Sequence, residues 1–355
     1  MKITRKYDEA AYLAPYWSGD VVLHESVMFL GDERRVKLMY PADEILGVFS
    51  ADLSVEYRGG VDYALEDGCF VRLEGGSIPV TTLEEYFPEN NDEKKYFGSA
   101  VEGHKYIWFG KSAWLYERQT AVTYRHSAKW DGPVPEHQPD KFARFMAKCR
   151  AGGEVTVLFY GDSITTGCNT TGMTGVPPYT PTWCEMVVSA LGKITGNGKI
   201  KYVNTAVGGR DSRWGLAELQ TRVLDHKPDL LIHAFGMNDG GKPGEEYMEL
   251  NREMIDKVRA ELPGCDICLV STTLPHWRVA GFFGHQPEFE PLLAAYAEPL
   301  PNVGIVPMTS LHAHILKRKE FYSFTGNNVN HPNDFQARLY AQAILAAVAG
   351  VGAGV

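Results

Sequence analysis

Residues 155–165 read VTVLFYGDSIT, and this stretch decides the fold of the C-terminal two thirds of the chain. Its first six residues form an apolar run with the length of a buried strand, and a glycine, an aspartate and a serine follow as a turn. Further apolar runs lie at 200–203, 230–235, 267–271 and 303–306, with helical spacing of apolar residues between them. Apolar strands that alternate with helices predict a parallel sheet covered on both faces.

The first third of the chain has a different pattern. Between residues 21 and 124, short β-rich runs alternate with Gly- and Asp-containing turns, which predicts an antiparallel β-sandwich of the jelly-roll kind. A Pro-rich stretch at 131–139 is the best candidate for a linker. We therefore expect a β-sandwich domain over residues 1–135 and an α/β domain over residues 136–355.

Composition excludes several classes of partner. The formal net charge of −9 over 355 residues disfavours nucleic acid and anionic membranes, which are themselves negative. Six cysteines are scattered along the chain; Cys265 and Cys268 form a C-x-x-C that leads into an apolar strand, so we interpret them as inert thiols rather than a metal or redox site. We expect no metal and no cofactor. No signal peptide or membrane-spanning run is visible, which predicts a cytoplasmic protein.

Four short motifs fall where a parallel sheet binds ligands, at the carboxyl ends of strands or just before a helix. They contain Ser163, Gly209, Asn238 and His331. Each motif has an ordinary structural interpretation: a helix cap for Ser163, a turn glycine for Gly209, an Asx-turn for Asn238 and a structural histidine for His331. What distinguishes them is their order and their common placement at the edge of the sheet.

This ordered set strongly resembles the SGNH (GDSL-type) hydrolase family over roughly residues 154–349. Block one is Gly161-Asp162-Ser163, block two centres on Gly209, block three is 236–239 (GMND), and block five is the loop of His331. The resemblance implies a flavodoxin-like three-layer α/β/α fold. Together with the β-rich front part, it makes the chain similar to two-domain carbohydrate acetylesterases. No G-x-S-x-G elbow is present, so the α/β-hydrolases match poorly.

The family resemblance also implies a mechanism of acyl transfer. Ser163 would attack an ester carbonyl while His331 takes its proton. The amides of Ser163 and Gly209 and the side chain of Asn238 would form the oxyanion hole.

One position departs from the family pattern. The family usually places an aspartate three residues before the histidine, and this chain has Asn328 there. We predict that Asn328 orients His331 through its side-chain oxygen. The alternatives are a backbone carbonyl or a carboxylate from elsewhere, for which Asp334, Glu288 and Glu290 are candidates, although Asp334 also suits a cap of the last helix.

Residues next to the blocks are candidates for contact with the substrate. They are Asp162, Thr166, Arg210 and Trp214, and Arg210 could equally form a structural ion pair. The tract 170–182, rich in Gly, Pro and Thr, is predicted to be a loop over the site.

The expected activity is hydrolysis of short acyl esters, acetyl above all, on O-acetylated carbohydrate. The partner would be a small-molecule or oligosaccharide ester, with no nucleic acid and no membrane, and the quaternary state stays open, a homo-oligomer included. Two alternatives remain: a general short-chain carboxylesterase, thioesterase or lysophospholipase, and a non-catalytic carbohydrate-binding protein on a hydrolase fold.

Overall fold

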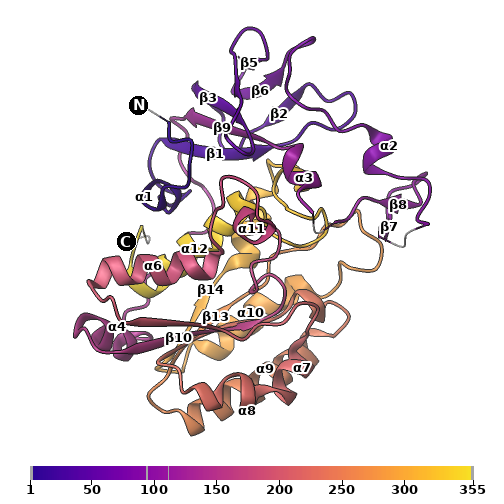
Figure 1. The fold of residues 1–355 in the computed structure, drawn as a ribbon. Helices are drawn as coiled ribbons and strands as arrows, with labels where there is room; N and C mark the ends of the chain where they lie inside the picture. Colours follow the sequence, from indigo (N-terminus) through magenta and orange to yellow (C-terminus); the bar gives the residue numbers. More distant parts are fainter. Residues whose placement is uncertain (1–2, 93–94, 111, 353–355) are drawn as a thin grey trace.

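The computed structural model describes residues 3–92, 95–110 and 112–352. Figure 1 shows that the molecule has two regions, a β region and, below it in this view, an α/β region. The α/β region is built on a five-stranded parallel sheet with the order β11-β10-β12-β13-β14. Its strands are β10 (Val155–Gly161), β11 (Ile200–Asn204), β12 (Leu230–Ala234), β13 (Asp266–Val270) and β14 (Val303–Val306). The order reverses at β10, and the crevice at such a switch point is where ligands bind in sheets of this kind.

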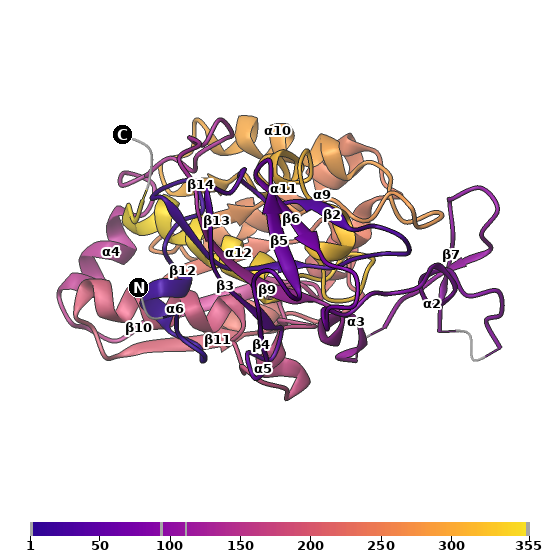
Figure 2. The ribbon, with the colours of Figure 1, turned by 90° about the horizontal axis from the view of Figure 1, so that it is seen from above.

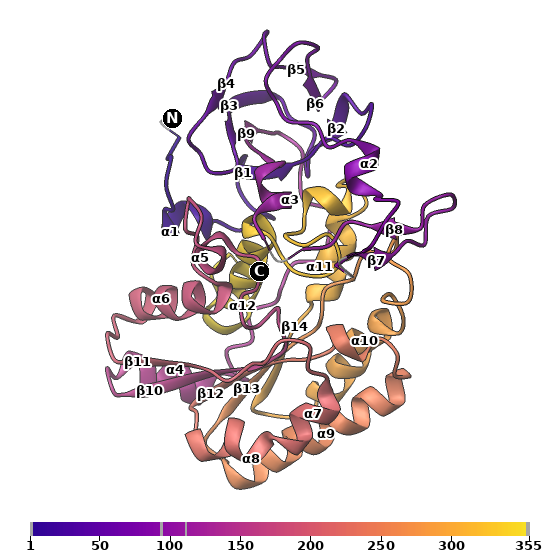
Figure 3. The ribbon, with the colours of Figure 1, turned by 45° about the vertical axis from the view of Figure 1, so that its right-hand side comes forward.

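Helices cover both faces of this sheet, as Figures 1 and 3 show. One face packs against α4 (Ala143–Arg150), α6 (Trp183–Thr195), α11 (Met308–Ile315) and α12 (Asp334–Ala349). The other face packs against α7 (Ser212–Ala217), α8 (Leu219–Arg222), α9 (Gly244–Glu261) and α10 (Gln286–Ala297). Strands β10, β12, β13 and β14 are mostly apolar and buried because helices remove both of their faces from water, whereas the edge strand β11 is partly exposed. The predicted three-layer α/β/α fold is thus confirmed.

The N-terminal region contains antiparallel sheets, as the turn pattern predicted. The larger sheet has the order β1-β9-β3-β4, formed by β1 (Val21–Val27), β9 (Thr120–Arg125), β3 (Glu44–Ser50) and β4 (Glu56–Tyr57). The smaller sheet has the order β2-β6-β5, formed by β2 (Arg35–Lys37), β6 (Cys69–Arg72) and β5 (Tyr63–Glu66). Buried side chains of both sheets share one hydrophobic cluster, as a sandwich requires.

Short elements connect this sandwich to the α/β region. They are the helices α1 (Glu9–Tyr12), α2 (Leu83–Tyr86), α3 (Trp114–Glu117) and α5 (Thr171–Thr174), and the hairpin of β7 (Phe97–Gly98) and β8 (Tyr106–Ile107). Seen from above in Figure 2, the hairpin extends beyond one edge of the molecule. Backbone hydrogen bonds tie it to the loop that follows β13, from Ala100 N to Arg278 O (2.8 Å) and from Ala280 N to Gly98 O (2.8 Å).

A few predicted elements differ from the structure. The expected helix near 216–224 is two short helices, α7 and α8, followed by a 3₁₀ turn (Leu224–His226). The strand expected at 21–23 extends to Val27 as β1, and of the strand expected at 27–30 only Val27 belongs to it, while Leu30 forms an isolated bridge with Thr81. A β-bulge between Val22 and Glu25 breaks the regular alternation along β1 and therefore hid its continuity.

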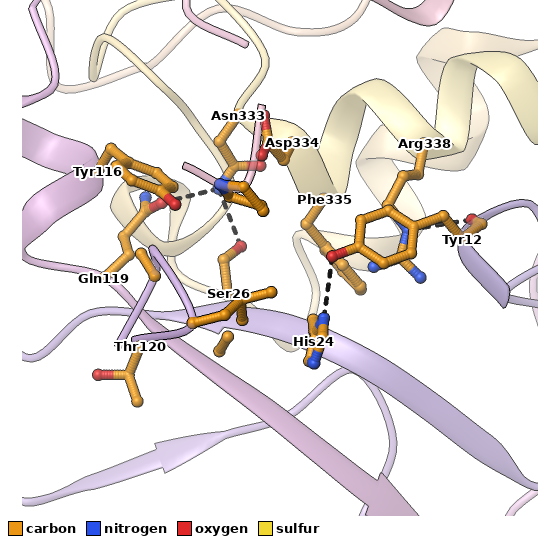
Figure 4. Close-up of a pocket in the computed structure, with 14 residues that line it drawn as sticks. Tyr12, His24, Ser26, Tyr116, Gln119, Thr120, Asn333, Asp334, Phe335 and Arg338 are labelled. Atoms are coloured by element: carbon orange, nitrogen blue, oxygen red, sulfur yellow. Dashed lines mark hydrogen bonds between the residues drawn. The ribbon is translucent and has the colours of Figure 1, made fainter. Parts of the chain in front are cut away.

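Polar and charged side chains join the two regions across a buried interface. Figure 4 shows Asn333 donating to Ser26 Oγ (2.9 Å) and Gln119 Oε1 (3.0 Å), beside a cavity of about 40 Å³. Deeper in the interface, Lys319 donates to the carboxylate of Glu25 and to Ser26 O (2.9 Å), and both charged side chains are essentially inaccessible to water. Burial lowers the pKa of Lys319, and the Glu25 carboxylate opposes that shift.

The first and last segments of the described chain also pack together. On α12, Gln342 Nε2 donates to Tyr12 O (3.0 Å) and Ala14 O (2.8 Å), and Arg338 Nε donates to Tyr12 O (3.0 Å). Trp17 Nε1 donates to Gly352 O (2.5 Å). The segment around α1 is therefore a structural part of the α/β region.

Candidate active site

Ser163 lies in a turn directly after β10, at the switch point of the sheet. Its carbonyl accepts hydrogen bonds from Cys168 N (3.2 Å) and Thr166 Oγ1 (2.7 Å), which close the turn. No long helix starts here, contrary to the prediction of a helix N-terminus, because several turns and α5 intervene before α6 begins at Trp183. Gly161 is required before the serine, since a Cβ there would lie 2.4 Å from Ala234 O.

The structure brings Ser163 and His331 together from positions 168 residues apart. Ser163 Oγ lies 2.8 Å from His331 Nε2, which is a normal hydrogen-bond distance. Only 6 % of Ser163 and 4 % of His331 is exposed, so the pair is largely shielded from bulk water. A hydroxyl held against an imidazole nitrogen is the arrangement by which a base activates a serine nucleophile.

Asn327 holds the loop that carries His331. Its Oδ1 accepts hydrogen bonds from the backbone N–H groups of Val329 (3.0 Å), Asn330 (2.9 Å) and His331 (2.9 Å). The carbonyl of His331 is held in turn by Gly326 N (2.9 Å). The sequence reasoning missed Asn327, although a cluster of asparagines before a helix is a signal for side-chain capping of loop amides.

Asn169 orients the imidazole ring. Its Oδ1 lies 2.7 Å from His331 Nδ1, while its Nδ2 donates to Gly326 O (3.1 Å) and Gly110 O (3.4 Å). Because both carbonyls can only accept, the amide nitrogen must face them and its oxygen must face the ring. His331 Nδ1 is then the donor, and Nε2 presents its lone pair to the hydroxyl of Ser163.

The prediction that Asn328 orients His331 is wrong. Asn328 adopts a left-handed backbone (φ 65°), and its side chain points to the N-terminal region. Its Oδ1 accepts from Tyr86 Oη (2.7 Å), and its Nδ2 donates to Trp108 O (3.0 Å). The amide of Asn328 is thus committed to fastening the histidine loop to the β region, and Asn169 occupies the position predicted for it.

The carboxylates considered as alternative partners of His331 have other contacts. Asp334 accepts from Thr171 N (2.8 Å) and Thr171 Oγ1 (2.6 Å) at the start of α5, and Asn333 rather than Asp334 caps α12. Glu290 accepts from Ser271 Oγ (2.6 Å). Glu288 lies 2.7 Å from His285 Nδ1. The orienting group is therefore a neutral amide.

Two further loops border the site with the candidate oxyanion donors. Gly209 has a left-handed backbone (φ 75°), which glycine adopts freely, and a Cβ on the neighbouring Gly208 would lie 3.5 Å from Ser163 Cβ. Asn238 Nδ2 donates to Arg210 O (3.0 Å), so the second and third blocks are joined directly. Gly208 therefore lies next to Ser163, and Asn238 is fastened to the loop that contains Gly209. The role of Gly209 and Asn238 as oxyanion donors stays a prediction.

A buried ion network holds these two loops in place. Lys242 lies between Asp211 (2.6 Å) and Asp239 (3.1 Å). Asp239 also accepts from Ser212 N (3.0 Å), and Asp211 caps α7 by accepting from Trp214 N (3.0 Å). The network links the loop after β11 to the loop after β12 and holds the two loops in a fixed relation to each other.

The four residues predicted to contact substrate lie in two places: Asp162 and Thr166 in the serine turn, and Arg210 and Trp214 at or just after the second block. Asp162 is buried and accepts from Ile164 N (2.9 Å), so it shapes the turn instead of lining a pocket; burial raises its pKa to about 7. Thr166 bonds within the same turn. Arg210 is exposed and lies over the ring of Trp214 (5.4 Å), beside the second block.

Among the described residues, no group of three or more His, Cys, Asp or Glu side chains could hold a metal ion. Cys265 and Cys268 are buried in the core, and burial raises the pKa of both thiols. No helix in the described part of the chain is both long enough and apolar enough to cross a membrane.

Comparison with known proteins identifies the family. The model of the GDSL-like lipase/acylhydrolase family matches residues 159–339, just over half of the chain. The chain therefore belongs to the GDSL-like lipase/acylhydrolase family, which confirms the resemblance seen in its four motifs. No curated protein sequence matches the chain significantly.

Solved structures show a similar fold. Two structures of a two-domain esterase active on acetylated mannans, one co-crystallised with mannopentaose, match with TM-scores of 0.50 and 0.51 at 22 % sequence identity. These matches cover 62 and 63 % of this chain, which spans just over half (55 and 56 %) of theirs. An acetylxylan esterase from Geobacillus stearothermophilus matches with a TM-score of 0.46 at 18 % identity, over 55 % of this chain and 94 % of that one.

Proposed function

We propose that this protein is a serine esterase that removes short acyl groups, acetyl above all, from O-acetylated carbohydrate. One observation carries the proposal: Ser163 Oγ lies 2.8 Å from His331 Nε2, and the other ring nitrogen lies 2.7 Å from a neutral amide oxygen. This geometry leaves Nε2 as the acceptor, so the ring is ready to take the serine proton.

The reaction would proceed in two steps. In the first, Ser163 Oγ attacks the ester carbonyl, its proton passes to His331 Nε2, and the C–O bond to the sugar breaks as His331 protonates the leaving oxygen. In the second, water gives a proton to His331 and attacks the acyl-enzyme; the bond from the acyl carbon to Ser163 Oγ breaks, His331 returns its proton to that oxygen, and acetate leaves. The amides of Ser163 and Gly209 and the Asn238 side chain would stabilise the oxyanion in both steps.

Asn169 gives this mechanism a particular character. It stabilises the correct tautomer of His331 by geometry, but it provides no negative charge to the imidazolium that forms during catalysis. Shielding by the surrounding loops must then supply part of the effect that a carboxylate supplies elsewhere, because hydrogen bonds strengthen in a site of low polarity.

The carbohydrate part of the proposal rests on the likeness of fold. The two-domain esterase matched above is active on acetylated mannans. In this chain, a β region contacts the histidine loop of the α/β region. The alternative enzymatic function is a general carboxylesterase or thioesterase, which would hydrolyse small esters and thioesters without selecting a particular alcohol or thiol.

Acetate release separates these classes. The enzyme is incubated with acetylated manno-oligosaccharides, acetylated xylo-oligosaccharides, and 4-nitrophenyl esters with acyl chains of two to eight carbons. We expect acetate from at least one oligosaccharide and a steep preference for acetyl among the nitrophenyl esters. Flat activity across chain lengths, without acetate from either oligosaccharide, would replace the carbohydrate esterase by a general carboxylesterase.

Covalent labelling tests catalysis itself. A fluorophosphonate probe should modify the folded wild-type protein at Ser163, and Ser163→Ala should remove both the label and the esterase activity, by roughly 10⁴-fold or more in rate. An unlabelled, folded wild-type protein would favour the non-catalytic carbohydrate-binding alternative.

A further inference from the structure

An open aromatic cleft lies on the β region beside the active site. Its volume is about 700 Å³, within the range of small-molecule sites. All of its lining side chains come from one N-terminal segment: Glu85, Lys95, Tyr96, Phe97, Trp108, Phe109, Gly110, Ser112 and Trp114. The segment includes the end of α2, the hairpin strand β7 and the start of α3, which stand together in Figure 3.

The floor of this cleft is connected to the catalytic pair by hydrogen bonds. Gly110 O accepts from Asn169 (3.4 Å), whose other side-chain atom contacts the ring of His331. Trp108 O accepts from Asn328 (3.0 Å), in the histidine loop itself. The cleft therefore opens next to the loops that carry the imidazole, on the side formed by the β region.

The walls of the cleft are rigid. Trp108 stacks on Trp114, with the ring centroids 4.2 Å apart. The guanidinium carbon of Arg118 lies 3.8 Å from the centroid of the Trp114 ring. Arg118 also donates to Glu85 (2.9 Å), so a carboxylate is held at the rim. A preorganised wall loses little conformational entropy when a ligand binds.

This combination of groups suits a neutral sugar chain. The C–H faces of a pyranose ring are apolar and pack against aromatic side chains, whereas its hydroxyls need hydrogen-bond partners such as those of Glu85, Ser112 and Tyr96. Resting on the esterase function proposed above, we propose that the cleft binds the sugar units next to the acetylated one, so that the β region supplies a leaving-group subsite.

The test compares two kinds of substrate in the same enzyme. For each protein we take the ratio of kcat/KM on the acetylated oligosaccharide to kcat/KM on 4-nitrophenyl acetate, whose alcohol is too short to reach along the cleft. Tyr96→Ala removes one wall, and Ser112→Trp fills the cleft from its exposed edge. Both changes should lower the ratio about tenfold, as expected for losing one aromatic contact of about 1.4 kcal/mol.

A matched control is Tyr296→Ala on α10. Like Tyr96, Tyr296 is half-buried and has a cationic group near its ring: Arg252 Cζ lies 5.7 Å from the Tyr296 ring centroid, and Lys95 Nζ lies 5.4 Å from the Tyr96 ring centroid. Unlike Tyr96, Tyr296 does not line the cleft. The control should leave the ratio unchanged. An unchanged ratio in both Tyr96→Ala and Ser112→Trp, or an equal fall in Tyr296→Ala, overturns the proposal.

Direct binding separates failure of the cleft from failure of the esterase proposal. Calorimetric titration of Ser163→Ala with the deacetylated manno- and xylo-oligosaccharides should detect binding, weakened about tenfold when Tyr96→Ala is added. Sugar binding that depends on Tyr96, without any acetate release by the wild type, would keep the cleft and reject the esterase. Acetate release from oligosaccharides by the wild type, without binding that depends on Tyr96, would keep the esterase proposal and reject the cleft as a sugar site.

Discussion

The turn of Ser163 and the loop of His331 meet at one point but are held in different ways. The serine turn is held by neighbours in sequence, such as Trp183, whose Nε1 donates to Ile164 O (2.8 Å). The histidine loop is held by the distant β region: Tyr86 and Trp108, which bond Asn328, lie 242 and 220 residues before it. The position of Ser163, the proposed nucleophile, thus depends on the α/β region alone, whereas the position of His331, the proposed base, depends on both regions.

The largest effect should come from breaking the buried ion pair between the regions. Lys319→Met leaves the Glu25 carboxylate buried without its cation, which should lower the free energy of unfolding by about 3–5 kcal/mol. Urea unfolding followed by circular dichroism measures this. The exposed Lys317→Met is the control and should change stability by less than about 0.5 kcal/mol. Equal stability of the two variants would show that the pair does not fasten the regions.

The serine turn should show a pH-dependent effect of similar size. Burial raises the pKa of Asp162 to about 7, above the value near 3.9 of an unfolded chain. The stability contributed by its protonated form is full below about pH 4 and is lost as the pH rises through about 7, a change of about 4 kcal/mol. Asp162→Asn lacks this titration, so the stability of wild type relative to the variant should fall between pH 4 and 8. Parallel pH profiles of the two unfolding free energies would contradict the burial argument.

Asn169 connects the two halves of the site, and its replacement should affect the rate more than stability. Asn169→Ala should lower kcat/KM by about 10–100-fold, because the ring loses its tautomer and its orientation. Asn169→Asp places a carboxylate beside the imidazole, raises the pKa of the ring and should move the acid limb of the pH–rate profile upward. A purely structural residue would alter the rate in both variants without moving that limb.

The smallest effect should come from loosening the histidine loop. Tyr86→Phe removes the donor to Asn328 Oδ1, which should cost about 1 kcal/mol of stability and lower kcat less than tenfold. Tyr340→Phe is a suitable control, since Tyr340 is also buried and donates to Thr273 Oγ1 (3.1 Å) away from the loop. Both variants should lose similar stability, and only Tyr86→Phe should lower kcat. A lowered kcat in both would mean that general destabilisation causes the loss.

The place of Ser163 at the edge of the sheet was predictable because it directly follows a parallel strand, and the carboxyl ends of such strands share one edge. Its meeting with His331, which precedes the last helix, followed from the family motifs. The family motifs gave the order of the blocks, and the apolar runs gave the strands. The motifs and the apolar runs are both local patterns, which can be identified from about ten neighbouring residues of the sequence.

The partner of His331 was not predictable in this way. Asn328 has the expected sequence spacing, but its positive φ turns the side chain toward a hydroxyl from a distant segment. Asn169 also has a positive φ (70°), and its amide is oriented by carbonyls at 110 and 326. Such directions follow from tertiary contacts, which sequence spacing alone does not contain.

The packing of the segment around α1 against α12 has a consequence for biosynthesis. Tyr12 is synthesised 326 and 330 residues before Arg338 and Gln342, the two residues that bond to its carbonyl. Contacts across such long separations close late, because their loop entropy is lost before they form. A nascent chain would therefore contain Ser163 well before His331, which follows 168 residues later, and the two side chains could meet only after the histidine loop has been made.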